Sequence, residues 1–311
     1  MMASSTSTKE FRLTEQRNPA SRNFDRMETL EMIRLMNRED RKVAAAVASE
    51  IPAIARAVDE IVRRLQGGGR LIYVGAGTSG RLAVLDASEC PPTFGVSSEA
   101  VQGLIAGGRK AITSAVEGAE DSAKNAVRDL RHKKLSKKDV VVGVAASATT
   151  PYVLGAVKYA RKVGAAAIGV AANRIGPLKK HTDIFIGAAV GPEVLTGSTR
   201  LKAGTAQKMV LNMLSTAAMV QLGHAYENLL IDMERTNQKL EGRAVRILQE
   251  ASGAGVSSAR RALRASGHNM RVGLVMLKRG VKAAEAKKLL VQAKGNLRMA
   301  LDEAAKARRN G

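Results

Sequence analysis

The stretch LIYVGAGTSGR (residues 71–81) joins a short apolar run to a loop of glycines and hydroxyl side chains. Such a pattern is typical of a buried strand that ends in a ligand-binding loop. The same pattern recurs further along the chain, least clearly in the first of these stretches: VQGLIAGG (101–108), DVVVGVAAS (139–147), AAAIGVAAN (165–173) and DIFIGAAVG (183–191). We therefore expect these stretches to form the strands of one sheet.

Helical segments are expected between most of these strands, notably at 119–131 and 151–163. Alternating strands and helices predict an α/β fold, in which helices cover both faces of a parallel sheet. Ligands of such sheets bind beyond the carboxyl ends of the strands. The loops after the apolar runs are therefore the first place to look for a site.

The flanking regions are expected to be helical. Between Thr29 and Leu65 apolar residues recur at intervals of three and four, which predicts two amphipathic helices. Residues 1–10 are polar and are expected to be disordered. After the last strand we expect a long helix over 200–223 with Ser198 or Thr199 as its N-cap. Glycines then separate short helical segments: 244–251, 256–265, 270–278, 282–292 and 296–308.

These segments predict a division of the chain into four parts. The expected parts are a disordered tip with a helical lead-in (1–59), the sheet domain (60–223), a connecting helix (224–243) and a small all-helical C-terminal domain (244–311).

The composition excludes several classes of protein. The 311 residues are 45% hydrophobic but only 3% aromatic, so small aliphatic side chains must fill a large core. The single cysteine, Cys90, excludes an intrachain disulfide, points to a reducing compartment and is expected to be a small buried residue. The four histidines lack ligand spacing, so no metal is expected: His132, His181, His224 and His268. With no signal-peptide or membrane-spanning pattern, we expect a soluble, cytoplasmic protein.

The chain carries a net charge of +22. Residues 235–311 contain 18 basic and 5 acidic residues, so 18 − 5 = 13 of these charges lie in the tail. Such a tail attracts anions, but a solvated basic face is an equally simple interpretation. Because the tail has no aromatic residue to stack on a base, nucleic acid is not the expected partner.

The loop over residues 75–80 matches the pattern G-x-G-x-x-G, which alone is a weak indication of dinucleotide binding. That function also needs an acidic residue after the next strand, whereas Glu99 precedes it. Gly77, Thr78 and Ser79 instead place backbone N–H groups and hydroxyls at a helix N-terminus, which favours a compact phosphate.

A second group of hydroxyls follows the strand over 139–147, in Ser147, Thr149 and Thr150. These residues stand before Pro151, which suits the first turn of a helix. Because carboxyl ends of parallel strands meet at one edge, both hydroxyl groups are expected to bind one anion. The alternative is that they only cap helices.

Carboxylates follow in two places. Glu89 stands shortly before Pro91 and Pro92, which we expect to stop the helix and leave Glu89 partly buried at the edge of a loop near the first phosphate loop. Glu117, Glu120 and Asp121 begin another helix, where acidic residues also favour the helix dipole without any further role.

A polar cluster occupies the stretch GPEVLTGSTRLKAGTAQK (191–208), where Glu193 and Lys202 stand close to several hydroxyls. The crowding indicates a ligand, although an ordinary capped helix is the simpler alternative.

At these residues the sequence resembles the N-acetylmuramic acid 6-phosphate etherases, which are built on a sugar isomerase (SIS) domain. The related vertebrate glucokinase regulatory protein is a longer chain with two SIS domains, whereas this chain has room for one. The stretches that carry the resemblance are TEQRNPAS (14–21), LIYVGAGTSGRLAVLDASECPPTFG (71–95), GLIAGG (103–108), AVEGAEDS (115–122) and GPEVLTGSTRLKAGTAQK (191–208).

The resemblance implies roles for individual residues. It implies that Glu89 and Glu120 are catalytic, with Glu117 as an alternative to Glu120. It also implies a homodimer with sites near the interface, no cofactor, and removal of D-lactate from C3 of the sugar phosphate in peptidoglycan amino-sugar recycling. The residues expected to bind substrate are Gly77, Thr78, Ser79, Ser147, Thr149, Thr150 and, by a looser resemblance to sugar-facing positions, Glu193 and Lys202.

One loop departs from the family pattern. The family usually has Ser-Gly-Arg-Thr-Pro where this chain has Ser-Ala-Thr-Thr-Pro (147–151), so we expect a second phosphate loop of different shape. Two other functions stay open on the sequence: a sugar-phosphate isomerase on the same fold, and a sugar-phosphate sensor without enzymatic activity.

Overall fold

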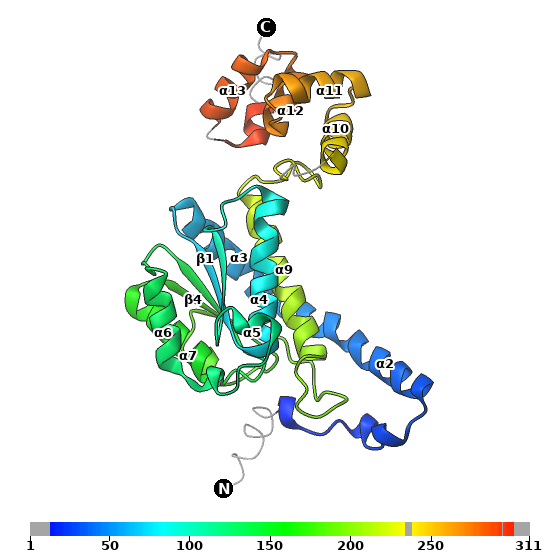
Figure 1. Ribbon diagram of the computed structural model, residues 1–311, viewed down its shortest axis with the longest axis vertical. Helices are drawn as coiled ribbons and strands as arrows, with labels where there is room; N and C mark the ends of the chain where they lie inside the picture. The colour runs from blue at the N-terminus through cyan, green and yellow to red at the C-terminus, as the bar shows by residue number, and fades with distance from the viewer. Residues whose placement is uncertain (1–12, 234–237, 294, 302–311) are drawn as a thin grey trace. The chain divides into compact units, whose positions relative to one another are not determined.

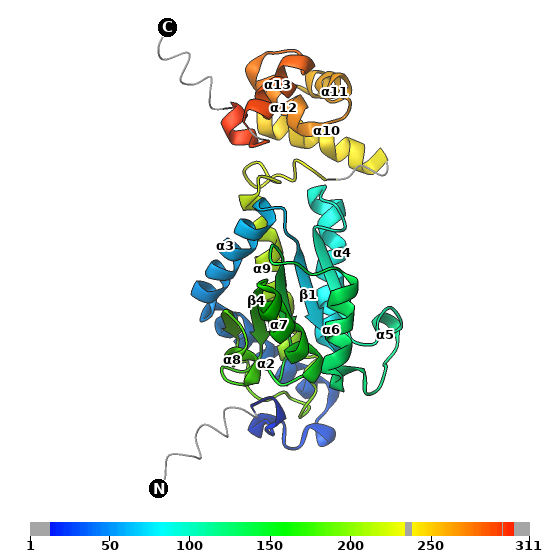
Figure 2. The same cartoon turned by 90° about the vertical axis from the view of Figure 1, so that its left-hand side faces the viewer.

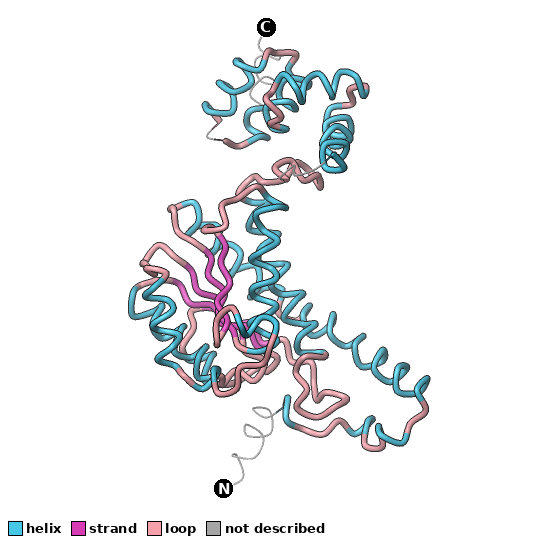
Figure 3. Tube along the Cα trace, in the orientation of Figure 1, coloured by secondary structure: helices cyan, strands magenta, loops and turns pink. Residues whose placement is uncertain are grey.

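The computed structural model describes residues 13–233, 238–293 and 295–301. The chain divides into two compact units, which are described separately. The first, the sheet unit, comprises Met1–Ser88 and Ser98–Thr216, and the second, the helical unit, comprises Glu89–Ser97 and Ala217–Gly311. Figure 3 shows that strands occur only in the sheet unit among the described residues.

The sheet has five parallel strands in the order β2-β1-β3-β4-β5, which confirms the predicted α/β fold, including its weakest strand. The strands β1, β3 and β4 are buried along their whole length, which explains why they appear in the sequence as unbroken apolar runs. The bounds of the strands are β1 Leu71–Gly75, β2 Val101–Ile105, β3 Val140–Val144, β4 Ala166–Ala171 and β5 Ile184–Gly187.

Helices cover both faces of the sheet (Figures 1 and 2). One face is covered by α7 (Pro151–Val163), which packs on β3 and β4, and by α6 (Ala123–His132), which packs against α7. The other face is covered by α3 (Ile51–Gln66), α4 (Gly77–Phe94) and α9 (Lys202–Gln221). Two further helices of the sheet unit are short: α5 (Lys110–Thr113) and α8 (Pro177–Lys180).

The predicted helix over 151–163 is confirmed, whereas the one over 119–131 begins later. Residues 119–121 form a separate 3-10 turn, and the Ser122 hydroxyl then accepts a hydrogen bond from Asn125 N at 3.2 Å. This bond caps the first turn of α6, so the helix begins at Ala123.

The two amphipathic helices predicted before the sheet are confirmed as α2 (Thr29–Ala48) and α3. The first extends away from the sheet (Figure 1, blue). It follows three 3-10 turns: Leu13–Glu15, Pro19–Ser21 and Phe24–Arg26. The disorder predicted for residues 1–10 lies outside the described residues.

The prediction that Pro91 and Pro92 stop their helix is wrong. Both lie inside α4, which continues to Phe94. Because the prolines fall in the last turns, their missing N–H groups leave few backbone carbonyls without an intrahelical donor. Glu89 is consequently a helical residue.

The helical unit has its own apolar core, built from residues such as Leu248, Leu263 and Leu274. The connecting helix predicted over 224–243 is wrong for residues 224–233, which form a loop held by a bridge between Tyr226 and Leu229. The predicted helix over 296–308 is described only as far as residue 301. The helices are α10 Gln238–Ser252, α11 Val256–Ala265, α12 Met270–Arg279 and α13 Ala283–Gln292.

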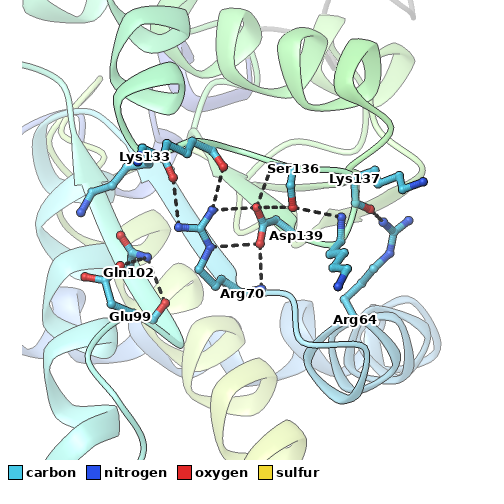
Figure 4. Close-up of polar contacts among 10 residues, drawn as sticks. Arg64, Arg70, Glu99, Gln102, Lys133, Ser136, Lys137 and Asp139 are labelled. Carbon is cyan, nitrogen blue, oxygen red and sulfur yellow. Dashed lines mark hydrogen bonds and ion pairs between the residues drawn. The ribbon is translucent and has the colours of Figure 1, made fainter.

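Arg70 and Asp139, which directly precede β1 and β3, form an ion pair at the amino ends of these strands (Figure 4). Arg70 Nη2 lies 2.8 Å from Asp139 Oδ2, and Arg70 N donates to Asp139 Oδ1 at 2.9 Å. Burial raises the pKa of Asp139, but its hydrogen bonds with Arg70 and Ser136 lower it more, so the net shift is downward. The pair fixes two neighbouring strands in register.

No described helix combines the length and the apolar character needed to cross a membrane.

Candidate functional site

The loops after β1 and β3 meet at the carboxyl edge of the sheet. The two strands are neighbours, and their last residues, Gly75 and Val144, are paired. A cavity of about 360 Å³ lies where the loops converge. Its lining includes the six residues predicted for the two phosphate loops, together with one predicted catalytic residue: Gly77, Thr78, Ser79, Ser147, Thr149, Thr150 and Glu120.

The first loop turns sharply into α4. Gly77 has a φ of +52°, which glycine adopts without strain. Thr78 is half-buried, whereas Ser79 is buried and its hydroxyl donates to Gln207 Oε1 at 2.9 Å. Thr78 and the free N–H groups of the first turn are therefore the groups best able to receive an anion.

The second loop is held by its own hydroxyls. Thr149 N donates to Ser147 Oγ at 3.2 Å, and the two side-chain oxygens lie 2.8 Å apart. Between them Ala148 has a φ of +62° and is fully buried, a conformation that costs alanine about 1–2 kcal/mol. Thr150 is the N-cap residue of α7. The loop keeps its hydroxyls in the cavity with alanine at the position where the family usually has glycine.

The electrostatics of the cavity come from backbone groups and carboxylates. Neither lysine nor arginine is among the residues that line it, in the described part of the chain. The helices α4 and α7 both begin at this edge. The partial positive charges of their N-termini favour an anion there. Three carboxylates also reach the lining, from Glu15, Glu120 and Asp121.

The structure distinguishes Glu120 from Glu117. Glu120 lines the cavity between the two hydroxyl loops, whereas Glu117 does not. A neighbouring pocket is lined by both acids and by Gly77. Gly118, with a φ of +69°, lies between the two acids and precedes the 3-10 turn Ala119–Asp121. Of Glu117 and Glu120, it is Glu120 that lines the cavity shared by both hydroxyl loops.

Glu89 does not line this cavity. Gly77 and Glu89 belong to the same helix, α4, and are twelve residues apart, so helix rise separates them by about 18 Å. The side chain is exposed, and the expectation that it is partly buried near the first phosphate loop is wrong for the single chain.

Glu193 and Lys202 are buried away from the cavity. Glu193 caps α9, because its carboxylate accepts hydrogen bonds from Lys202 N at 3.1 Å and Ala203 N at 2.9 Å. Burial raises the pKa of Glu193 despite these bonds. Lys202 donates to Glu39 Oε2 at 2.6 Å and to the Pro192 carbonyl at 2.7 Å. The contacts of both side chains are structural, and the contact with sugar predicted for them stays a prediction.

Sequence reasoning assigned no role to Glu15 or Gly197, which also line the cavity. Asp121, which was named with Glu117 and Glu120 as an acid at the start of a helix, lines it too. Thr199, which was expected as a possible N-cap and as one of the hydroxyls of the polar cluster over 191–208, lines it as well. Glu15 stands in the stretch TEQRNPAS, so the resemblance pointed to the segment but not to the residue.

Cys90 was expected to be a small buried residue, and this prediction is confirmed because the residue is 2% exposed.

Comparison with known proteins identifies close relatives over almost the whole chain. The chain is 54% identical over 289 residues to an N-acetylmuramic acid 6-phosphate etherase of Serratia proteamaculans (strain 568), covering 93% of this chain and 97% of the relative. It is 50% identical over 290 residues to an N-acetylmuramic acid 6-phosphate etherase of Clostridium beijerinckii, covering 93% and 95%.

Two family models match the sheet unit. The glucokinase regulatory protein N-terminal SIS domain matches residues 53–161, and the SIS domain matches residues 122–217. A solved phosphoheptose isomerase from Francisella tularensis covers 62% of this chain and 100% of its own, with 19% identity and a TM-score of 0.49. The sheet unit has the α/β architecture of an SIS domain.

Proposed function

Because the chain belongs to the N-acetylmuramic acid 6-phosphate etherase family, we propose that it removes D-lactate from this sugar phosphate and leaves N-acetylglucosamine 6-phosphate. The observation that carries the proposal is the cavity in which the two hydroxyl loops and Glu120 meet, within a chain about half identical to these etherases. A reaction of this kind is a C–O bond cleavage, so the protein is an enzyme of the lyase type.

The phosphate is the anchor of the substrate in this proposal. Thr78, Ser147, Thr149 and Thr150 offer hydroxyls, and the first turns of α4 and α7 offer backbone N–H groups. An anchored phosphate places the sugar carbons at fixed positions, and such positioning can supply a large part of the rate enhancement.

The ether bond breaks because of its position relative to the aldehyde of the ring-opened sugar. The C1 carbonyl acidifies the proton on C2, and a base removes that proton. The C3–O bond then breaks with its electron pair on oxygen, and an acid protonates this oxygen as lactate leaves. Water adds to C3 and a proton returns to C2, so the net reaction consumes one water. The scheme needs one carboxylate as base and one as acid.

Glu120 is proposed as the base and Glu89 as the acid. Glu120 lies beside the phosphate loops, which suits a group that acts on a carbon of the anchored sugar. Glu89 lies about 18 Å along α4 from the first phosphate loop of its own chain. It can therefore act only at a site that it reaches from another copy of the chain.

A homodimer supplies that second copy. Leu85 is 50% exposed and precedes Glu89 by four residues, so both project from the same face of α4. Further exposed apolar side chains occur on α2 and α9, in Leu30, Ile33 and Met213. An interface through these side chains would bury them and bring Glu89 to the partner copy.

The first test measures D-lactate released from N-acetylmuramic acid 6-phosphate. We expect release by the unaltered protein and a loss of about 10²-fold or more in Glu120→Gln, because the base is removed without a change in size. Glu117→Gln is the matched control and should retain activity. Conversion of the sugar phosphate without lactate release would instead support an isomerase.

The second test asks whether Glu89 acts across the dimer. Glu89→Gln and Glu120→Gln are each expected to be inactive alone, whereas the two chains produced together should form mixed dimers with one intact site. If chains pair at random, about one quarter of the normal activity returns. Mixed dimers that release no lactate would show that Glu89 does not act in this way.

A further inference from the structure

We propose that Glu15 binds the sugar portion of the substrate, as a residue that determines specificity for a phosphosugar over phosphate alone. The inference rests on the proposed function and assigns a role to the TEQRNPAS segment, which the proposed reaction does not use.

Glu15 reaches the cavity from outside the sheet. It belongs to the 3-10 turn Leu13–Glu15 near the N-terminus, yet it lines the same cavity as Thr78, Ser147 and Glu120. Its carboxylate lies against Gly197, where an added Cβ atom would stand 3.5 Å from Glu15 Oε2. Glu15 and Gly197 are thus far apart in the sequence, near the start and near the end of the sheet unit, but lie together at the site.

The segment that carries Glu15 is firmly held. Thr14 and Asn18 are buried on either side of it, with 2% and 6% exposure, whereas Glu15 itself is exposed. Asn18 Nδ2 donates to the Pro192 carbonyl at 3.1 Å. The segment is therefore anchored by buried residues that leave the Glu15 carboxylate free to face the cavity.

The contacts that hold the Glu15 segment are linked to the buried ion pair between Lys202 and Glu39. The same Pro192 carbonyl accepts a hydrogen bond from Lys202, which is paired with Glu39. The Asn18 side chain also hydrogen-bonds Glu39. This network joins the Glu15 segment to α2 and α9, so Pro192 and Lys202 of the stretch over 191–208 help to hold Glu15 in place.

The charge of the cavity decides which end of the substrate Glu15 meets. Phosphate is dianionic and is attracted by hydroxyls and helix N-termini, whereas a carboxylate beside it is repelled. Sugar hydroxyls and amide N–H groups are donors, and an ionised carboxylate is purely an acceptor. With the phosphate at Thr78 and Ser147, the sugar is the part that faces Glu15.

The experiment compares two ligands by titration calorimetry: N-acetylglucosamine 6-phosphate and inorganic phosphate. Because hydrogen bonds to a charged group are strong, Glu15→Ala should weaken sugar-phosphate binding about 10-fold to 100-fold. Inorganic phosphate should bind with an affinity changed by less than about 2-fold, because it does not reach Glu15. Glu15→Gln keeps the size and one acceptor, and is expected to fall between the two.

Asp25→Ala is the matched control, since Asp25 is an exposed acid of the same N-terminal region that does not line the cavity. It should bind both ligands normally. Unchanged binding of the sugar phosphate by folded Glu15→Ala and Glu15→Gln would overturn the inference. An equal loss for both ligands would also overturn it, because the segment would then support the cavity as a whole.

The binding test does not depend on turnover. A protein that binds the sugar phosphate through Glu15 but releases no lactate would contradict the proposed function and leave this inference standing. In an active protein, Glu15→Ala should raise KM about 10-fold or more while kcat changes less.

Discussion

A buried ion pair joins α2 to the start of α9. Lys202 Nζ lies 2.6 Å from Glu39 Oε2, and the two side chains are 2% and 5% exposed. Burial raises the pKa of Glu39, but its bonds with Lys202 and Lys42 and the charge of Lys202 outweigh that effect and lower the pKa from 4.5 to about 2. Removing one partner would leave an uncompensated buried charge.

This pair makes stability depend on pH. Because the folded pKa of Glu39 lies below the unfolded value, its contribution is fully present above about pH 4.5 and is lost as the pH falls through about 2. The free energy of unfolding should fall by up to about 3 kcal/mol from this group over that range. Urea unfolding at several pH values measures the effect.

The matched comparison is the double variant Glu39→Gln with Lys202→Met, which removes both charges. Its free energy of unfolding should fall less steeply between pH 5 and pH 2 than that of the unaltered protein. If the free energies of unfolding of the two proteins fell equally with pH, the ion pair would not be what lowers the pKa of Glu39.

Individual residues also show which parts of the site could be predicted from the sequence. The hydroxyls of both loops were identified because they follow recognisable strands. The burial of Glu193 and Lys202 could not be predicted, because it depends on Glu39 and Pro192, which pack against them only in the folded chain. Glu15 was missed for the same reason, since it is far from both hydroxyl loops in the sequence and meets them only in the folded chain.

At the scale of elements, the packing of α4 on the sheet positions the first phosphate loop. Gly80 has no room for a side chain: a Cβ atom there would stand 2.5 Å from Ile105 Cγ1 and 2.8 Å from the Gly75 carbonyl. The N-terminus of α4 can approach β1 closely only because both positions are glycine.

Gly80→Ala should therefore push α4 away from the strand. We expect a loss of about 1–3 kcal/mol in stability and weaker binding of inorganic phosphate. Gly242→Ala is the matched control, because Gly242 lies in α10 with open space around it. That change should raise stability by about 0.5–1 kcal/mol. Equal effects of the two substitutions, in unfolding and calorimetry, would contradict this explanation.

The five strands, expected from apolar runs, and the helix α7 were predicted well. The errors occurred where local signals conflict with packing. Pro91 and Pro92 were expected to end a helix, yet they lie in its last turns, where few backbone bonds are lost. Residues 224–233 were expected to continue a helix but form a loop.

At the scale of the whole molecule, the proposed site needs two copies of the chain. Leu85→Asp places a charge on the proposed interface and should yield a monomer in sedimentation equilibrium. D-lactate release should fall with it, because each cavity would lose the Glu89 of its partner. Val291→Asp is the control, since Val291 is 77% exposed on α13, outside the proposed interface. A monomeric Leu85→Asp protein with full activity would contradict the shared site.

The sequence by itself determined the parallel sheet, the two hydroxyl loops at its carboxyl edge and the family, because apolar periodicity and contiguous motifs are local properties of the chain. The tertiary structure alone decided which carboxylates meet at the cavity. Glu120 and Glu15 lie there, although more than a hundred residues separate them, whereas Glu89 follows the first phosphate loop in sequence and is carried away from it by helix rise. Distance along a chain and distance in space agree only within an element, and a catalytic site is assembled from several.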